Sequence, residues 1–310
     1  MLSKNSIVAV TSRSFSASQD LRKKLLLNFP NSVFNDSGKV LVGKDLINFL
    51  GDADAAVIAL EKLDSEVLSE LPKLKVVSKF GVGTDGVDFE ALKAHNVKFL
   101  HFPGTNKNSV AEIALANAIS LFHKIPKNQF FFVNGEWVQI KGTELRGKRV
   151  GVVGAGPIGK RFLELCSYFD CELMSYDLVQ DELFNKTYGV KESSLKEVMS
   201  LCDMISIHLP LTESTLGLIG SEEIRLMQPS SIIMNLSRGG IVDENSLIEA
   251  HRTGKIAGFA LDVFEKEPCD LSKFRNLENV ILTPHIGGSS IEAISNMGIA
   301  AIGGLIELID

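Results

Sequence analysis

The sequence predicts an α/β fold with two doubly wound parallel sheets, and three observations support this prediction. Short apolar runs alternate with amphipathic stretches along most of the 310 residues, a pattern typical of parallel sheets covered by helices. A glycine-rich turn at 154–159 follows one of the apolar runs, as expected where such a sheet binds a phosphate group. Strand-like runs occur on both sides of a turn-rich crossing at 101–109, so we expect two domains.

The composition is that of an ordinary soluble protein, with 45% hydrophobic and 23% charged residues. The formal net charge of -6 disfavours nucleic acid as a partner. No apolar run is long enough to cross a bilayer, and the chain starts directly with a predicted strand instead of a signal peptide. Its cysteines, Cys166, Cys171, Cys202 and Cys269, lack the paired spacing of a zinc site. We therefore expect reduced thiols in a cytoplasmic protein that uses no metal.

The first domain is predicted to contain four strands and three helices. The strands are expected at 7–10, 55–59, 74–78 and 97–100, and the helices at 20–29, 65–71 and 89–95. The loop from Lys79 to Gly86 follows the third strand, at the edge where open α/β sheets bind ligands. Its closely spaced glycines favour an anion site built from backbone N–H groups, with Lys79 as a supporting cation. A plain strand-to-helix connection is the alternative.

The second domain is predicted to contain six strands. They are expected at 148–153, 171–176, 203–207, 231–236, 256–261 and 279–282, the number in a doubly wound nucleotide-binding sheet. A long apolar helix is expected from near Val110 to His123, with Ser109 as its N-cap and Glu112 at its third position. The stretch 134–143 is loop-like. The tail from residue 289 is predicted to be an amphipathic helix that packs back on the first domain.

The turn at 154–159 has the residues that a pyrophosphate site requires. Gly154 permits the tight turn, Gly156 lets the phosphates approach the backbone, and Gly159 lets the helix pack close to the strand. Pro157 suits a first helical position, and the open amides of the helix start would face the phosphates. An ordinary strand–turn–helix unit is the alternative interpretation.

The strand after this turn ends at Asp177. This acid has the spacing of a carboxylate that hydrogen-bonds the ribose diol of a dinucleotide. Asp177 would repel a 2′-phosphate, and the following Leu178 and Val179 supply no cation to bind one. The sequence therefore predicts NAD as the cofactor in preference to NADP.

Four turns after later strands contain side chains suited to acid–base chemistry. They span 208–212, 235–240, 262–268 and 283–288. Because the carboxyl ends of parallel strands line one crevice, Arg238, Glu267 and His285 are expected to meet there. Each residue alone has an ordinary structural explanation, but their joint placement beside a dinucleotide turn indicates a catalytic site.

Several segments together resemble the D-isomer-specific 2-hydroxyacid dehydrogenases, a family that includes D-3-phosphoglycerate dehydrogenases and glyoxylate/hydroxypyruvate reductases. These segments are Asn235-Leu-Ser-Arg-Gly-Gly-Ile-Val-Asp-Glu244, Asp262-Val-Phe-Glu-Lys-Glu-Pro268, Thr283-Pro-His-Ile-Gly-Gly288, Gly81-Val-Gly-Thr-Asp-Gly-Val-Asp88 and Asn106-Lys-Asn-Ser-Val-Ala-Glu112. The resemblance covers essentially the whole chain in the family's order. It implies a Rossmann-type NAD domain at 105–287 and a flavodoxin-like substrate domain formed by 1–104 and 288–310.

The resemblance implies that Arg238, Glu267 and His285 are the catalytic residues. Reduction of a 2-keto acid needs a proton donor, and histidine suits this role because its ordinary pKa lies near neutrality. Glu267, in contact with the other ring nitrogen, would favour the imidazolium, and Arg238 would hold the substrate carboxylate by paired hydrogen bonds. The further substrate contacts that are implied are Lys79, Gly81, Val82, Gly83 and Asn106.

The resemblance also implies a set of cofactor contacts. Pro157 and Ile158 would lie on the pyrophosphate with the turn glycines, and Asp177 on the adenosine ribose. The remaining contacts are His208 and Pro210, Leu236 and Ser237 near the nicotinamide ribose, Asp262 on the carboxamide, and Ile286, Gly287 and Gly288 near the nicotinamide.

We therefore expect an NAD-dependent oxidoreductase that interconverts a D-2-hydroxy acid and a 2-keto acid between its two domains. The resemblance further implies a homodimer. The candidate substrates are 3-phosphoglycerate and related small acids, although the loop Leu60-Glu-Lys-Leu63 has only Lys62 where phosphoglycerate dehydrogenases usually bring an arginine to the phosphate. A glyoxylate/hydroxypyruvate-type reductase is one alternative. A non-catalytic NAD(H)-sensing protein like the related corepressors is the other. Formate dehydrogenases have glutamine in place of Glu267, so their reaction is disfavoured.

Overall fold

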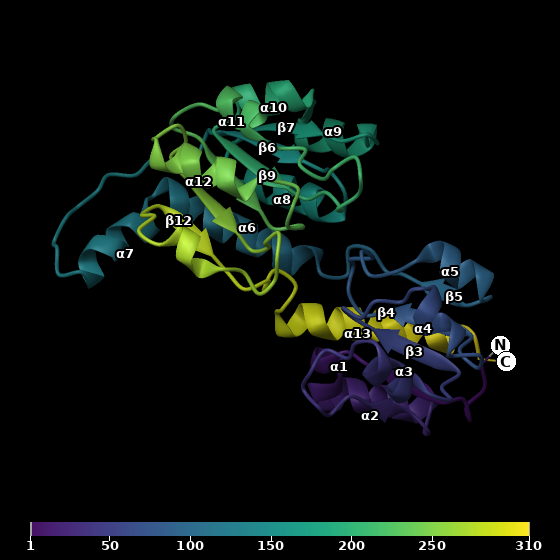
Figure 1. The fold of residues 1–310 in the computed structure, drawn as a ribbon. Coiled ribbons are helices and arrows are strands. Elements are labelled where there is room, and N and C mark those ends of the chain that lie inside the picture. The colour runs from purple at the N-terminus through teal and green to yellow at the C-terminus, as the bar shows by residue number, and fades with distance from the viewer. Residues whose placement is uncertain (1, 310) are drawn as a thin grey trace. The chain divides into compact units, whose positions relative to one another are not determined.

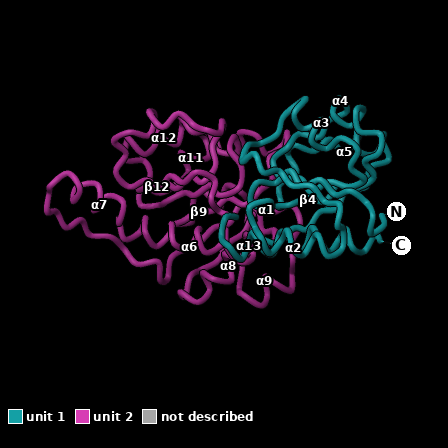
Figure 2. The backbone as a smooth tube through the Cα atoms, turned by 90° about the horizontal axis from the view of Figure 1, so that it is seen from below, with its two compact units in different colours: residues 1–106, 288–310 teal, residues 107–287 magenta. Residues whose placement is uncertain are grey.

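The computed structural model describes residues 2–309, which divide into two compact units (Figure 2). Unit 1 comprises residues 1–106 and 288–310, and unit 2 comprises residues 107–287. The first boundary therefore follows residue 106, where the sequence predicts it after residue 104. The return to unit 1 occurs at residue 288 in both divisions.

Unit 1 is built on a sheet of five parallel strands in the order β2-β1-β3-β4-β5. The strands are β1 (Val8–Val10), β2 (Val33–Phe34), β3 (Ala55–Ile58), β4 (Val76–Lys79) and β5 (Lys98–Leu100). The helices are α1 (Arg13–Ala17), α2 (Gln19–Asn28), α3 (Lys44–Leu50), α4 (Ser65–Ser69), α5 (Phe89–Ala94) and α13 (Ile291–Ile306).

Helices cover both faces of the unit 1 sheet because successive side chains of a strand point to opposite faces. Val8 and Val10 pack in a cluster with side chains of α1, α2 and α13, whereas Ala9 packs with α3, α4 and α5. The hydroxyl of Ser78 in β4 donates to the carbonyl of Ala301 in α13 at 2.9 Å. The prediction that the tail forms a helix packed on the first domain is therefore confirmed.

Unit 2 contains a sheet of seven parallel strands in the order β12-β11-β10-β9-β6-β7-β8. The strands are β6 (Arg149–Val153), β7 (Glu172–Tyr176), β8 (Lys191–Glu192), β9 (Met204–Ile207), β10 (Ile232–Asn235), β11 (Gly258–Leu261) and β12 (Val280–Leu282). The helices are α6 (Lys107–Phe122), α7 (Ile125–Val133), α8 (Pro157–Ser167), α9 (Glu182–Tyr188), α10 (Leu195–Leu201), α11 (Ser221–Leu226), α12 (Glu244–Arg252) and the 3-10 helix η1 (Leu271–Phe274).

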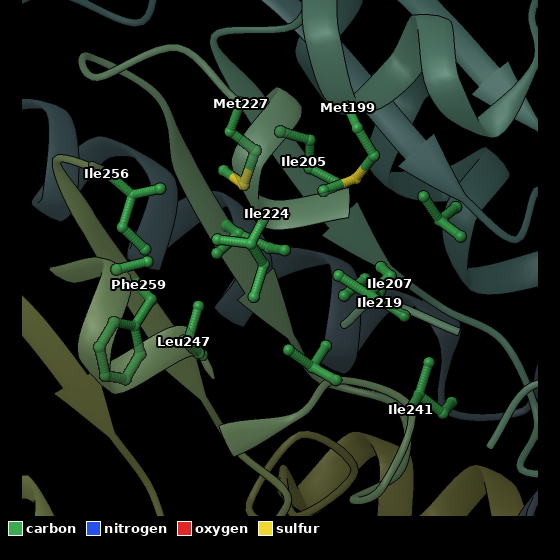
Figure 3. Close-up of a cluster of buried hydrophobic side chains, with 14 of the residues drawn as sticks. Met199, Ile205, Ile207, Ile219, Ile224, Met227, Ile241, Leu247, Ile256 and Phe259 are labelled. Carbon is green, nitrogen blue, oxygen red and sulfur yellow. The ribbon is translucent and has the colours of Figure 1, made fainter. Parts of the chain in front are cut away.

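The core of unit 2 lies on both faces of this sheet. Ile205 and Ile207 of β9 pack in one cluster with α10, α11 and α12 (Figure 3). Met204 of the same strand packs on the opposite face with α6 and α8. Because the strands are all parallel and paired in register, the loops that follow them begin at one edge of the sheet.

Two predictions about the start of unit 2 need correction. The long helix α6 begins at Lys107, not near Val110, and Ser109 lies inside it. Ser109 is therefore not the N-cap, and its hydroxyl donates instead to the carbonyl of Gly287 at 2.6 Å. The sequence pattern also does not predict α7, which has no buried residue. Figure 1 shows α7 and the loop after it extending away from the sheet of unit 2.

Two structural features are absent from residues 2–309. No helix there is both long and apolar enough to cross a bilayer. No group of three or more His, Cys, Asp and Glu side chains within it is arranged to hold a metal ion.

Candidate active site

The predicted site residues of unit 2 lie along one edge of its sheet, in loops at the carboxyl ends of adjacent strands. From β7 to β12 across the sheet, the loops contain Asp177 (after β7), the 154–159 turn (β6), His208 and Pro210 (β9), Leu236 to Arg238 (β10), Asp262 and Glu267 (β11), and His285 (β12). Open α/β sheets bind their ligands outside this edge. The order of the strands therefore arranges these residues as one continuous row.

The glycine turn brings backbone against backbone at two points. Gly154 has a φ of +101°, and a Cβ at this position would lie 2.7 Å from the carbonyl carbon of His208. A Cβ at Gly159 would overlap the carbonyl oxygen of Gly154. Glycine is therefore required at both positions, because a larger residue would push β6, α8 and the loop after β9 apart.

The start of α8 is open toward solvent and fits a pyrophosphate. Gly156 is the N-cap, it provides no side-chain hydrogen bond, and a Cβ built on it meets no atom within 4 Å. Pro157 occupies the first helical position. The first amides of this 11-residue helix thus have no side-chain cap, and a helix N-terminus of this kind attracts an anion.

Asp177 is held beside the glycine turn. Its Oδ2 accepts a hydrogen bond from the Ala155 amide at 2.6 Å, and its Oδ1 accepts one from the Val179 amide at 2.9 Å. The neighbouring Leu178 and Val179 side chains are exposed and apolar. A carboxylate in this position can bind a ribose diol, and no adjacent side chain in the sequence offers a charge for a 2′-phosphate.

His208 is neutral at physiological pH. Burial lowers the pKa of this imidazole to about 3, because a buried charge is poorly solvated. Its Nε2 shares a hydrogen bond with the Ser206 hydroxyl at 2.9 Å, whereas its buried Nδ1 has no hydrogen-bond partner among the described residues. His208 therefore places an uncharged ring at this edge of the sheet, with an Nδ1 atom that has no partner among the described residues.

Asn235 at the end of β10 orients the loop that contains Arg238. Its Oδ1 accepts hydrogen bonds from the amide and hydroxyl of Ser237, at 3.1 and 2.9 Å, and its Nδ2 donates to the Arg238 carbonyl at 2.7 Å. The guanidinium of Arg238 donates to the carbonyl of Ser237 at 2.6 Å. Asn235 is the first residue of the motif at 235–244, but only the structure shows that its side chain holds this turn together.

Glu267 and His285 meet through a direct hydrogen bond. The Oε2 atom of Glu267 lies 2.8 Å from Nδ1 of His285, and both side chains are about 40% exposed. The other carboxylate oxygen accepts the Phe264 amide at 3.1 Å. Each carboxylate oxygen therefore has a fixed partner, and Nε2 is the ring nitrogen of His285 that remains for a ligand.

The backbone of His285 is in the left-handed region, with a φ of +55°. A side chain in this region costs roughly 1 kcal/mol. The conformation is held by hydrogen bonds from the His285 amide to the carbonyls of Asp262 and Thr283, at 2.9 and 3.0 Å. Such strained backbone is common at functional sites.

Asp262 organises the segment around His285. It is 1% exposed, and its carboxylate accepts hydrogen bonds from the Thr283 hydroxyl and from the amides of Ile286 and Gly287, at 2.6 to 2.8 Å. All three donors belong to the segment after β12. This carboxylate therefore fixes the conformation of the segment 283–287. Its predicted contact with a carboxamide remains a prediction.

In unit 1, the loop after β4 has one left-handed glycine and a buried cation beneath it. Gly81 has a φ of +109°. Lys79 is 5% exposed, and its ammonium donates to the carbonyls of Ala59 and Phe80. The side chain of His101, which sequence reasoning did not select, contacts the Val82 carbonyl through Nε2 at 2.8 Å. Lys79 thus lies within the base of the loop, and His101 fixes the residue between the two glycines.

Asn106 and Gly288, also predicted site residues, lie together in unit 1. A Cβ at Gly288 would lie 3.0 Å from the Asn106 amide nitrogen. Asn106 is buried, and its Oδ1 has no hydrogen-bond partner among the described residues. A buried oxygen of this kind usually has a partner, so Asn106 is a candidate for binding a donor group of a ligand.

Comparison with known proteins assigns this arrangement to a family. The family profile described as "D-isomer specific 2-hydroxyacid dehydrogenase, NAD binding domain" matches residues 115–287. The chain is 36% identical over 259 residues to a D-3-phosphoglycerate dehydrogenase of Archaeoglobus fulgidus, an alignment that covers 82% of this chain and 49% of that protein. It is 33% identical over 262 residues to a glyoxylate reductase of Thermococcus litoralis, covering 81% of this chain and 79% of that protein.

Solved structures share the fold over nearly the whole chain. The pyruvate reductase of Chlamydomonas reinhardtii is 26% identical, with a TM-score of 0.81 over 98% of this chain and 97% of that one. By contrast, the chain spans about half the length of the D-3-phosphoglycerate dehydrogenases that it matches.

Proposed function

Because the chain belongs to the D-isomer-specific 2-hydroxyacid dehydrogenase family, we propose that it is an NAD-dependent enzyme that interconverts a 2-keto acid and a D-2-hydroxy acid. One observation supports this proposal most directly. The loops after the adjacent strands β10, β11 and β12 present a guanidinium, a carboxylate and an imidazole, and the last two are joined by the 2.8 Å contact between Glu267 and His285. These are the groups that reduction of a keto acid requires.

His285 is the proposed proton donor. NADH supplies the hydride when it is bound. Because Glu267 occupies Nδ1 of the ring, the proton for the carbonyl oxygen comes from Nε2. Glu267 holds the ring through Nδ1 so that Nε2 is available to the substrate. In the oxidative direction, the neutral ring accepts the hydroxyl proton at the same atom.

Arg238 is the proposed carboxylate ligand of unit 2, since a guanidinium binds a carboxylate through two parallel hydrogen bonds. In unit 1, the backbone amides of Gly81, Val82 and Gly83 are proposed to bind a substrate carboxylate. Lys79, whose ammonium donates to the carbonyls of Ala59 and Phe80, is proposed to supply positive charge at the base of this loop. Asn106 is proposed to contribute its unused buried oxygen.

Unit 2 contains the NAD-binding domain of the family, and we propose a role for each cofactor residue. The start of α8, from Gly156 to Gly159, binds the pyrophosphate, and Asp177 binds the adenosine ribose. The remaining contacts lie in the loops after β9, β10 and β11 and in the segment after β12: His208, Pro210, Leu236, Ser237, Asp262, Gly287 and Gly288. The carboxylate of Asp177 favours NAD over NADP.

We propose that the substrate is a small acid without a phosphate group. The loop that would face a substrate phosphate has one cation, Lys62, whose ammonium pairs with Asp64 at 2.9 Å. This pairing raises the pKa of Lys62. The adjacent Glu61 is buried and accepts the Ala59 amide at 2.7 Å. A phosphate would therefore compete with Asp64 and approach a second carboxylate.

We further propose a homodimer in a reducing compartment such as the cytoplasm. The arm formed by α7 and the loop to residue 138 exposes large apolar side chains, including Phe132 and Trp137, as expected of an interface between subunits.

Burial raises the pKa of Cys171 to about 11 and that of Cys202 to about 12. These thiols remain protonated and unreactive, and all four cysteines are free, which is usual for cytoplasmic proteins.

The proposed function is tested by the loss of NADH absorbance with a panel of acids: glyoxylate, hydroxypyruvate, pyruvate, 2-ketoglutarate and 3-phosphohydroxypyruvate. We expect turnover with at least one unphosphorylated acid. The His285→Ala variant should lower kcat by roughly 10²- to 10⁴-fold, the contribution of a general acid. Its Kd for NADH, measured by fluorescence titration, should change less than about twofold. His285 follows β12, which β11, β10 and β9 separate from β6 and its glycine turn.

The same experiment separates the alternatives. NADH binding without turnover of any acid would favour a nucleotide-sensing protein. Turnover fastest with 3-phosphohydroxypyruvate would contradict the absence of a phosphate site. A His285→Ala variant with full activity would disprove the proton-donor role.

A further inference from the structure

Glu244 is a buried carboxylate outside the proposed catalytic residues. It is the first residue of α12 and is 3% exposed. Its Oε1 accepts the Glu265 amide at 2.6 Å, and its Oε2 pairs with the ammonium of Lys273 in η1. In return, the Glu244 amide donates to Oε1 of Glu265 at 3.3 Å. The start of α12 and the loop after β11 are thus joined by two reciprocal hydrogen bonds.

The loop that Glu244 holds is the one that contains Glu267. Glu265, the partner of Glu244, lies between Phe264 and Glu267 in the chain. The Phe264 amide donates to Oε1 of Glu267 at 3.1 Å, while the Phe264 ring packs edge to face on Phe274, with ring centroids 5.8 Å apart. A shift of the Glu265 peptide therefore moves the amide that orients Glu267.

On its other side, Glu244 ends the segment that begins with Arg238. The two segments also meet at Gly239, where a Cβ would overlap the carbonyl of Phe264. The Arg238 segment and the Glu267 segment are consequently in contact near the start of the β10–α12 connection, at Gly239, and at its end, at Glu244. Glu244 provides the only one of these two contacts that depends on a side chain.

The burial of Glu244 is difficult to explain by stability alone. The Glu244 carboxylate is costly to desolvate although its partner Lys273 is partly exposed, and apolar residues of similar volume are often as stable as such a pair. Its position is better explained by the geometry that its hydrogen bonds impose, because directional bonds fix a loop more closely than apolar contact does. The residues it connects are those proposed to bind the substrate carboxylate and to orient the proton donor.

We propose that Glu244 is a positioning residue, which holds the Arg238 and Glu267 segments at a fixed separation so that Glu267 keeps its contact with His285. The positioning itself follows from the hydrogen bonds above, and only its consequence for turnover rests on the proposed function. Glu244 acts through Glu265, Lys273 and the backbone of Phe264.

The test compares four variants of the full chain. Glu244→Ala removes both bonds, whereas Glu244→Gln keeps an oxygen for the Glu265 amide. The double variant Glu244→Met/Lys273→Met replaces the ion pair by apolar side chains. Glu249→Gln, an exposed glutamate on the same helix, is the matched control.

The first readout is independent of turnover. The ring nitrogens of His285 are observed by long-range ¹H–¹⁵N NMR at one fixed pH and assigned with His285→Gln, and the Glu267→Gln variant supplies the signal of a broken contact. In Glu244→Ala and in the double variant, the Nδ1 signal should move toward that of Glu267→Gln. In Glu244→Gln and Glu249→Gln it should stay at the position of the unmodified protein.

The second readout is steady-state kinetics with NADH and the best acid of the panel. Misplacement of a catalytic group by about 1 Å can cost 10²-fold, so kcat of Glu244→Ala should fall about 10²-fold while the Kd for NADH changes less than about twofold. Glu244→Gln should recover most of this loss. The double variant should melt within a few degrees of the unmodified protein, which separates positioning from stability.

The possible results distinguish this inference from the proposed function. If the His285 signal and kcat are unchanged in both Glu244→Ala and the double variant, the positioning role is disproved. If Glu244→Ala does not fold, the double variant decides the question alone. If no acid is turned over but the His285 signal moves as expected, the proposed function fails and the positioning role stands.

Discussion

Each proposed functional side chain of unit 2 is oriented by a backbone group or a short side chain of its own or a neighbouring loop. The Ala155 amide holds Asp177, Asn235 holds the turn with Arg238, and the Phe264 amide holds Glu267. A side chain fixed in this way loses little entropy when a ligand binds. Hydrogen bonds within the protein thus orient the groups at this edge of the sheet, an arrangement that favours catalysis.

At the residue scale, we predict that Asp177→Ala relaxes the preference for NADH. The variant removes the negative charge that would repel a 2′-phosphate, so the ratio of kcat/KM for NADH to that for NADPH should fall at least about tenfold, or roughly 1.4 kcal/mol. Both values are measured with the same acid. Asp181→Ala, which removes an exposed carboxylate paired with Lys160 in unit 2, should leave the ratio unchanged. Equal use of both cofactors by the unmodified protein would refute the role of Asp177.

At the scale of elements, the β6–turn–α8 unit depends on two glycines for different reasons. Gly159 is in contact with backbone, and Gly156 faces open space. The first glycine is therefore required by packing within the protein. The second is required only if a ligand approaches the backbone there.

We predict opposite effects for alanine at these two positions. Gly159→Ala forces α8 away from β6 and should destabilise the protein by about 1–3 kcal/mol, the usual cost of overpacking, as measured by thermal unfolding. Gly156→Ala should leave the melting temperature nearly unchanged but weaken NADH binding more than about tenfold. Gly303→Ala, a helical position in unit 1 with open space for a Cβ, is the control for both. NADH binding unaffected by Gly156→Ala would place the pyrophosphate elsewhere.

At the scale of the whole molecule, the arm formed by α7 and the loop to residue 138 contributes nothing to the core of unit 2. No residue of α7 is buried. Phe132 and Trp137 are 60% and 83% exposed, with ring centroids 5.9 Å apart. Large apolar side chains grouped on an exposed arm cost free energy in water unless another surface covers them.

We therefore predict that Phe132→Ser/Trp137→Ser weakens the homodimer without unfolding the protein. Sedimentation equilibrium should show a Kd for the dimer at least about 10²-fold higher, because two aromatic anchors are lost from each subunit. The melting temperature, measured at a protein concentration below that Kd, should be unchanged. Tyr168→Ser, which removes an exposed aromatic residue elsewhere in unit 2, is the matched control. A monomeric unmodified protein at micromolar concentration would contradict the proposed dimer.

Much of the fold follows from local patterns in the sequence. Most strands of both sheets, the glycine turn and the final helix are recognisable because backbone conformation and side-chain periodicity are determined over a few residues. The elements that escape prediction include the strands β2 and β8 and the helices α1, α3 and α7. Two of these are only two residues long, and α7 has no buried face to create a periodic pattern.

The sequence by itself determined which residues could act, since the motifs around Arg238, Glu267 and His285 are short and continuous. Only the tertiary structure decided how those residues are held. Ser109 binds the carbonyl of Gly287, 178 positions away, and Glu244 binds the loop of Glu267 in the same non-local manner. Such contacts depend on packing of segments that are distant in the chain, and no local pattern records them, because a hydrogen bond between remote residues leaves no periodicity in either segment.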